Sequence, residues 1–290
     1  MKFELTEDQV AFASAITDLM RAGDSVAVAR AWASGDTGPG VALWKRLADL
    51  GLTALVVPED EGGLGGTLVD LVVAFEVLGR ELAVGPWIES AALAPQLEGE
   101  MVTAAALPLA PYAADAGVAR LLSGTAGASH ASIDSTRSLT EVAGADSFDP
   151  AALDRAVLAA SAQLLGAGER VLADSVTYVK QRKQFGREIG SYQAIKHQLA
   201  DVRIALDFAR PLVLGAALGE VPASAAKVAA SDAAYLAART GLQVHGAIGY
   251  TAEFDLSLWL NRIRALVTAW GTPAYHRARV LAVLEETRAG

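Results

Sequence analysis

The chain has 290 residues, of which 52% are hydrophobic, so it carries enough apolar material to bury a continuous core. It has no cysteine, which excludes disulfides, thiol nucleophiles and thiolate metal sites, and its four histidines are too scattered to indicate a zinc site. The net charge of −9 argues against a nucleic-acid partner, because binding to phosphate backbones depends on clustered Lys and Arg.

The charge is distributed unevenly along the chain. Residues 1–150 carry 8 Lys+Arg and 21 Asp+Glu, a net charge of −13, whereas residues 151–290 carry 16 and 12, a net charge of +4. A small polyanionic ligand is therefore expected to bind the C-terminal half. No apolar run is long and uncharged enough to span a bilayer, and Met1 to Thr6 has no basic head followed by an apolar stretch, so we expect a cytoplasmic protein without membrane contact.

The first hundred residues show helical spacing of apolar positions. A helix is expected to begin after Thr6, which has the features of an N-cap with Gln9 three residues later. Further helices are expected at 44–50 and 68–82, and the segment 51–58 between them is expected to be extended.

The remaining sequence changes character twice. Residues 101–150 are rich in Ala, Ser, Gly and Thr, and short strands are expected at 118–122, 131–133 and 138–142. A long buried helix is expected from Pro150 to the break at Gly186 and Gly190. It is followed by helices at about 191–208, 223–244, 257–269 and 273–287. The sequence thus predicts a mainly α fold with a helical domain at 1–100, a reduced β segment at 101–150 and a helical bundle at 151–290.

Three segments resemble motifs of the acyl-CoA dehydrogenase family, in the family's order. They are 44–51 leading into 57–63, then 181–201, and finally 243–253. The resemblance covers most of the chain outside residues 101–150. It implies the family's N-terminal helical domain and C-terminal four-helix bundle, and a role in the FAD-dependent α,β-desaturation of an acyl-CoA thioester.

The residues of the second motif also have suitable chemistry for a flavin dinucleotide. Arg182 offers a planar, permanently charged fork to a pyrophosphate, Gln184 an uncharged amide, and Phe185 an aromatic face. Gly186 permits close approach of the backbone to a ligand. Taken singly, Arg182 and Lys183 would be better explained as a solvated helix end and Gln243 as the cap of a turn, but the ordered set of motifs favours the cofactor.

The resemblance implies a shared site. In the family, these positions reach across a subunit interface to hold the neighbour's FAD, with a glutamine matching Gln243 beside the adenosine, so at least a dimer is implied. The resulting candidate cofactor-binding residues are Arg182, Gln184, Phe185, Gln193, Gln243, Gly246 and Thr272.

The family's catalytic base is missing from both positions where the resemblance would place it. The reaction requires a carboxylate that removes the α-proton while a hydride passes to the flavin. In most members this base is a glutamate before a Gly-Thr pair, whereas here Trp270 precedes Gly271-Thr272. In a second group the glutamate lies on the long helix, where this chain has Ala156. Residues 101–150 also lack the family's Thr-Glu-Pro loop and Lys-Trp strand. No catalytic residue is therefore assigned.

These departures resemble those of shortened actinobacterial subunits of heteromeric α2β2 acyl-CoA dehydrogenases. The leading hypothesis is a base-less partner that completes an FAD site shared with another acyl-CoA dehydrogenase-like subunit, which acts on an acyl-CoA and passes electrons to an acceptor of the electron-transfer-flavoprotein type. Two alternatives remain. One is a complete homomeric dehydrogenase with its base displaced to Glu253, Glu169 or Asp154. The other is a non-catalytic helical scaffold without FAD, in which Trp270 fills the acyl pocket.

Overall fold

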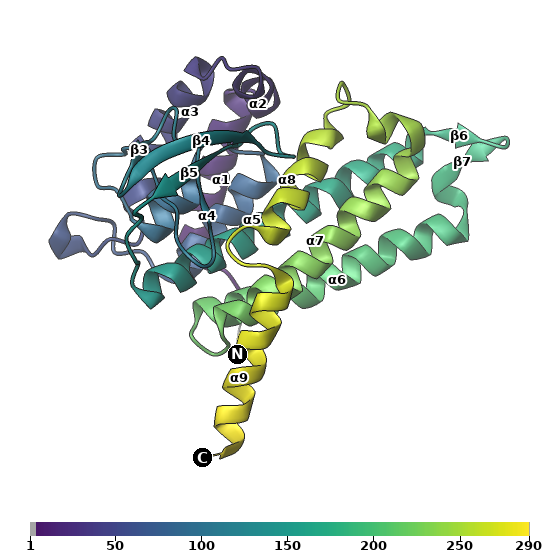
Figure 1. Cartoon of the computed structure of the whole chain (residues 1–290). Helices are drawn as coiled ribbons and strands as arrows, with labels where there is room; N and C mark the ends of the chain where they lie inside the picture. Colours follow the sequence, from purple (N-terminus) through teal and green to yellow (C-terminus); the bar gives the residue numbers. More distant parts are fainter. Residues whose placement is uncertain (1–3, 290) are drawn as a thin grey trace.

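The computed structural model describes the backbone of residues 4–289 and the side chains of residues 4–286; Met1–Phe3 lie outside the described residues. Two helical parts pack on each other, and a small β part lies over the N-terminal one (Figure 1). The fold is mainly α, as the sequence predicts, and the division of the chain at about residues 100 and 150 stays a proposal. Within residues 4–289, no helix is both long enough and apolar enough to cross a membrane.

The N-terminal part contains four helices and three short helical turns. They are α1 (Glu7–Ala22), α2 (Ser25–Ala33), α3 (Gly38–Asp49), η1 (Leu52–Ala54), η2 (Glu59–Glu61), α4 (Leu68–Arg80) and the π-helical turn η3 (Ile88–Leu93). The expected N-cap is confirmed, because Thr6 and Gln9 form a reciprocal capping box at the start of α1. The Gln9 side chain also donates to Asp70 (2.9 Å), which caps α4, so the two helix starts are tied together.

Three features of this part differ from the sequence prediction. The segment after α3 is not extended: Gly51, with φ +89°, ends α3 and leads into η1, whose three residues are all buried. Helix α2 was not expected; Asp24, in the left-handed region at φ +50°, caps it by accepting from the backbone of Ala27 (3.2 Å). The π-helical turn η3 was likewise not expected.

The middle part is a small, mostly exposed sheet. Strands β2 (Tyr112–Ala114), β5 (Ser138–Ala143) and β4 (Thr125–Ala131) form an antiparallel sheet in that order, and β1 (Val102–Thr103) pairs with β3 (Arg120–Leu121) in parallel. The strand expected at 138–142 is confirmed. The strand expected at 131–133 is wrong, because β4 ends at Ala131; β4 is exposed along its whole length and so shows no apolar alternation.

The C-terminal part is a bundle of long helices. It comprises α5 (Pro150–Gln181), the hairpin strands β6 (Lys183–Gln184) and β7 (Arg187–Glu188), the turn η4 (Ile189–Ser191), α6 (Gln193–Ala217), α7 (Ala223–His245), the turn η5 (Gly246–Tyr250), α8 (Leu256–Thr268) and α9 (Pro273–Ala289). The prediction that the helix beginning at about residue 191 ends near residue 208 is wrong. Helix α6 continues through Pro211 because the residues beyond it, Val213 and Leu214, are buried in the bundle.

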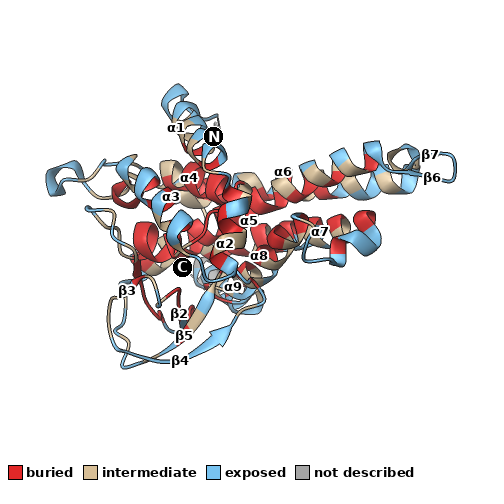
Figure 2. Cartoon of the chain, turned by 90° about the horizontal axis from the view of Figure 1, so that it is seen from above, coloured by how far each residue is buried: buried red, intermediate tan, exposed pale blue. Residues whose placement is uncertain are grey.

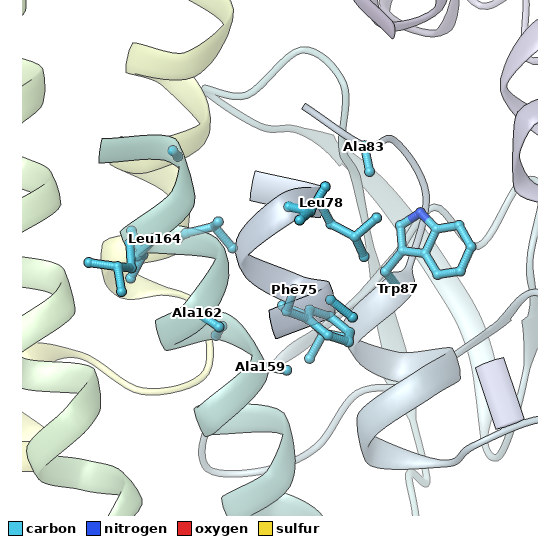
Figure 3. Packing of buried hydrophobic residues seen from close by; sticks show 14 of the residues in the cluster. Phe75, Leu78, Ala83, Trp87, Ala159, Ala162 and Leu164 are labelled. Atoms are coloured by element: carbon cyan, nitrogen blue, oxygen red, sulfur yellow. The ribbon is translucent and has the colours of Figure 1, made fainter. Parts of the chain in front are cut away.

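The N-terminal helices and the bundle share one hydrophobic core. Helices α4 and α5 cross so closely that a Cβ added to Gly166 would lie 1.9 Å from the carbonyl oxygen of Glu76, and one added to Gly79 would lie 2.1 Å from that of Gln163. Figure 3 shows Phe75 and Leu78 of α4 packed in this region. Buried residues therefore concentrate at the centre of the molecule, whereas the β6–β7 hairpin stands exposed at one end (Figure 2).

Candidate cofactor-binding site

The β6–β7 hairpin carries Phe185 at its tip. Phe185 and Gly186 both have positive φ, +51° and +80°, as the two central residues of a tight hairpin turn of this kind require. A non-glycine residue in the left-handed region costs about 1–2 kcal/mol. The Phe185 side chain is also 92% exposed. The hairpin thus presents a large aromatic ring to solvent at a left-handed position.

The base of the hairpin is anchored to the end of α5. The backbone N–H of Arg182 donates to the carbonyl of Tyr178 (2.9 Å), and that of Ile189 donates to the carbonyl of Arg182 (2.9 Å). The Arg187 guanidinium lies 3.9 Å from the ring centroid of Tyr192, at the start of α6. These contacts fix the direction in which the hairpin projects from the bundle (Figure 1).

Arg182 is available to bind an anion. Its side chain is exposed, and within the described part of the chain no carboxylate lies at ion-pair distance from it. Gln193 is the first residue of α6, and the N-cap residue Tyr192 makes no side-chain cap. The carbonyl of Tyr192 accepts from the backbone of Ile195 and Lys196 (both 3.1 Å), so among the described residues only the first two N–H groups of the helix have no partner. A free guanidinium near an uncapped helix N-terminus favours a phosphate group.

Gln243 lines a cavity of about 490 Å³ between α6, α7 and η5. This cavity, called here the α7 pocket, is lined by Gln198, Leu236, Arg239, Thr240, Leu242, Gln243 and Tyr250. No carboxylate is among these residues, and Arg239 has no carboxylate partner within residues 4–286. At the rim of η5, Gly246 has φ +62° and ψ −138°, a backbone conformation that essentially only glycine adopts.

The hairpin and the α7 pocket lie at the same end of the bundle (Figure 1). The ring of His245, the last residue of α7, stacks on Tyr178 near the end of α5. On the other side, Arg30 of α2 donates to the carbonyls of Ala252 and Glu253 (3.1 and 2.8 Å) and to the carboxylate of Asp255 (2.6 Å). The turn that follows Gln243 is therefore held from two sides.

Six of the seven candidate residues are brought to this end of the molecule, and Thr272 is not. Thr272 precedes α9, at the far end of α8, where its hydroxyl accepts from the backbone of Tyr275 (3.2 Å). The sequence interpretation missed Arg239, Arg30 and the Tyr178–His245 stack. Only Arg239 could have been found, since it lies one helical turn before Gln243 on the same face.

Neither position expected for the catalytic base can serve as one. Trp270 is fully buried with φ +58°, and its backbone carbonyl accepts from Nε2 of His276 (2.8 Å). Ala156 is fully buried inside α5. Both positions are filled by apolar side chains.

The three alternative carboxylates are engaged or exposed elsewhere. Glu169 accepts from Arg203 (2.6 and 2.7 Å) and Arg210 (3.0 Å); burial alone would raise its pKa, but these two arginines lower it. Asp154 pairs with Arg279 (3.0 Å). Glu253 has an exposed side chain on the loop after η5. A general base needs a pKa near the working pH, so Glu169 in particular is unsuited to that role.

Comparison with known proteins identifies the family. Residues 6–100 match the family model described as acyl-CoA dehydrogenase, N-terminal domain, and residues 148–285 match that of the C-terminal domain. The chain is 34% identical over 270 residues to acyl-CoA dehydrogenase IpdE2 of Mycobacterium tuberculosis, covering 81% of this chain and 84% of that protein.

Two solved structures share the whole fold. Butyryl-CoA dehydrogenase from Megasphaera elsdenii has a TM-score of 0.81 at 21% identity, covering 98% of this chain and 100% of the other. A chain of the ChsE4-ChsE5 complex from Mycobacterium tuberculosis has a TM-score of 0.82 at 22% identity, covering 99% of both chains. The chain belongs to the acyl-CoA dehydrogenase family.

Proposed function

We propose that this chain is the base-less partner in a heteromeric acyl-CoA dehydrogenase, where it completes an FAD site held mainly by another subunit of the family. The observation that carries the proposal is the exposed, left-handed Phe185 beside the unpaired Arg182. An exposed aromatic ring at a fixed turn can pack on the flat ring of a ligand. Here the exposed aromatic ring is accompanied by a cation that suits a pyrophosphate.

The residues at this end of the bundle fit FAD. Arg182 and the start of α6 would hold the pyrophosphate, and Phe185 would pack on a flat ring. The α7 pocket would take the adenosine part, with Gln243 as a hydrogen-bonding group and Leu236 and Tyr250 as its apolar walls. When bound, FAD supplies the hydride acceptor for desaturation of an acyl-CoA. The net charge of +4 on residues 151–290 suits this dianionic ligand.

The base is proposed to come from the partner. Trp270 and Ala156 provide no carboxylate, and Glu169 is held in an ion-pair network with Arg203 and Arg210. The likeness of the fold to a chain of the ChsE4-ChsE5 complex supports assembly with a second acyl-CoA dehydrogenase subunit. An acyl-CoA as substrate, an electron-transferring flavoprotein as acceptor and a cytoplasmic location are parts of the same proposal.

The two alternatives make different demands on the isolated chain. A homomeric dehydrogenase would hold FAD and turn over an acyl-CoA without a partner, and the bonded state of Glu169 and Asp154 disfavours it. A scaffold that has lost FAD does not explain the exposed Phe185 ring or an α7 pocket whose lining has no carboxylate.

Purification of the tagged chain from its native cells tests the proposal. We expect a second acyl-CoA dehydrogenase subunit to co-purify, with one FAD for each pair of chains, and the isolated chain to hold no FAD and to lack activity. Stoichiometric FAD and turnover by the isolated chain would establish the homomeric alternative. A complex without flavin would establish the scaffold.

A further inference from the structure

The last helix, α9, is attached to the bundle through a single buried side chain. Within residues 273–286, His276 is the only side chain of α9 that is buried, and the others are half-buried or exposed. A helix of this length depends on the packing of a buried face more than on its own helix propensity. The helix also projects away from the bundle toward the C-terminus (Figure 1). Its attachment therefore depends mainly on His276.

Two ion pairs add little to this attachment. Arg277 pairs with Asp232 of α7 (2.7 Å), and Arg279 pairs with Asp154 of α5 (3.0 Å). All four side chains are at least 39% exposed, and exposed ion pairs stabilise a fold only weakly because water and salt screen them.

The hydrogen bonds of His276 fit a neutral ring. Nε2 donates to the carbonyl of Trp270 (2.8 Å), so Nδ1 of a neutral ring keeps a lone pair that accepts from the hydroxyl of Ser224 (2.9 Å). The ring also packs on Gly271, where an added Cβ would clash with Nε2. In a protonated ring Nδ1 would become a donor. The hydroxyl of Ser224, which is itself buried, would then lose its acceptor.

Lys227 of α7 holds the adjoining end of α8. Its Nζ donates to the carbonyls of Leu266 (2.7 Å) and Val267 (3.2 Å) and lies 3.4 Å from the hydroxyl of Ser231. Like His276, Lys227 is fully buried. Within residues 4–286, no carboxylate lies at ion-pair distance from either group. The turn between α8 and α9 is thus held by two buried ionisable groups without an acid partner.

The surroundings of His276 disfavour a charge on its ring. Burial lowers its pKa from the ordinary 6.5, and the positive charges of Lys227 and Arg279 lower it further, whereas the Trp270 carbonyl and the Asp154 carboxylate act in the opposite direction. Burial also lowers the pKa of Lys227 from 10.5 to about 7. Both groups bind a proton more readily once α9 and the end of α8 come away from the bundle. Acid therefore favours this release.

We propose that His276 and Lys227 form a pH-sensitive anchor that holds α9 and the α8–α9 turn on the bundle at neutral and alkaline pH and releases them in acid. Each group can shift the equilibrium between the attached and the released helix by at most about tenfold for each pH unit. The anchor lies at the opposite end of α8 from the proposed FAD surface (Figure 1). The proposal therefore does not depend on whether the hairpin binds FAD.

Amide hydrogen exchange of the full chain at about pH 8 and about pH 5.5 tests the proposal, because free carboxyl groups titrate below this range. After correction for the intrinsic effect of pH on exchange, we expect the protection of residues 270–286 to fall about ten- to a hundredfold at the lower pH. These residues should also be less protected than residues 156–167 of α5 at both pH values, since α9 is released without global unfolding.

Three variants assign the pH dependence to the anchor. His276→Gln keeps a donor and an acceptor but cannot carry a charge, and Lys227→Met keeps the length of the side chain without its amine. Each is expected to retain only about a tenfold fall in protection, and the double variant none. Arg277→Gln, which removes an exposed charge from the same helix, is the matched control and is expected to retain the full fall.

Equal protection of residues 270–286 at the two pH values in the wild type would overturn the proposal. So would a fall that persists in the double variant, since other groups would then cause it. Circular dichroism checks the fold of each variant.

Should the double variant fail to fold, proton NMR of the wild type gives a second test. The His276 ring resonance, identified by its absence in His276→Gln, is expected to titrate only as residues 270–286 lose protection. Titration of His276 with a pKa near 6.5 while α9 stays protected would contradict the proposal.

Discussion

The rings of Tyr178 and His245 stack with their centroids 4.2 Å apart and their planes at 27°, which joins the end of α5 to the end of α7. Nδ1 of His245 donates to the carbonyl of Gly241 (2.7 Å), which fixes the ring. Arg182 follows Tyr178 by one helical turn and Gly246 follows His245 directly. This contact therefore joins the base of the hairpin to the turn beside the α7 pocket.

The stack gives a first prediction. His245→Ala removes a buried ring, and we expect it to lower the free energy of unfolding by about 2–3 kcal/mol and to speed loss of FAD from the assembled complex. His245→Phe keeps a ring in place and is expected to retain more of both properties. Denaturant titration and flavin release measure the two effects. Equal flavin release from His245→Ala and the wild type would contradict the role given to the stack.

A second prediction concerns Arg30, which joins α2 to the loop after η5. Since its partners are partly exposed, we expect Arg30→Ala to lower the free energy of unfolding by only about 1 kcal/mol. Amide hydrogen exchange of residues 251–255 should nevertheless become markedly faster, because the loop loses its bonds to the N-terminal part. Arg46→Ala is the matched control. Unchanged exchange in Arg30→Ala would show that the loop is held without this arginine.

Lys227 gives a prediction of pH dependence. Its ammonium is buried and donates to the carbonyls of Leu266 (2.7 Å) and Val267 (3.2 Å), and burial lowers its pKa from 10.5 to about 7. Between these values the unfolded chain binds the proton more readily than the folded chain, so Lys227 makes the free energy of unfolding rise with pH. The rise from this one group is at most about 1.4 kcal/mol for each pH unit.

Comparison with Lys227→Met isolates this group from all others. Denaturant titrations between pH 7 and pH 10.5 should show the stability of the wild type increasing relative to the variant as pH rises. A constant difference across this range would mean that Lys227 keeps an ordinary pKa in the folded chain.

The crossing of α4 and α5 gives a fourth prediction. Gly166→Ala would put a methyl group 1.9 Å from the backbone oxygen of Glu76, so the two helices must separate, and we expect a loss of several kcal/mol in the free energy of unfolding. Gly117→Ala is the control, since an added Cβ there meets nothing within 4 Å. Similar midpoints of thermal unfolding for the two variants would refute this account of the crossing.

The sequence predicts well the features that depend on local signals. The Thr6 cap, the long helix from Pro150 and the glycine break after it all follow from nearby residues. The prediction fails where tertiary packing overrides a local rule, as at Pro211, which lies inside α6 because the helix beyond it is buried.

The candidate site also combines features that the sequence predicts with features that it does not. The motif at Arg182 could be read from the sequence, but the exposure and left-handed backbone of Phe185 could not. The hydrogen bonds of Arg30 join residues more than 220 positions apart in the sequence, and no local sequence pattern predicts them. Likewise, Lys227 has the spacing of an ordinary helix lysine, and only the packing of α8 on α7 reveals that it is buried.

The affinity of the assembled complex for FAD tests the central claim most directly. We expect Arg182→Ala, made in this chain only, to weaken FAD binding about ten- to a hundredfold, the effect of losing a bidentate charge-assisted contact, while Arg46→Ala leaves it unchanged. Thermal unfolding of the isolated Arg182→Ala chain should match the wild type, because this side chain is exposed. Wild-type FAD affinity in the Arg182→Ala complex would contradict the claim that this arginine holds a flavin dinucleotide bound to another subunit.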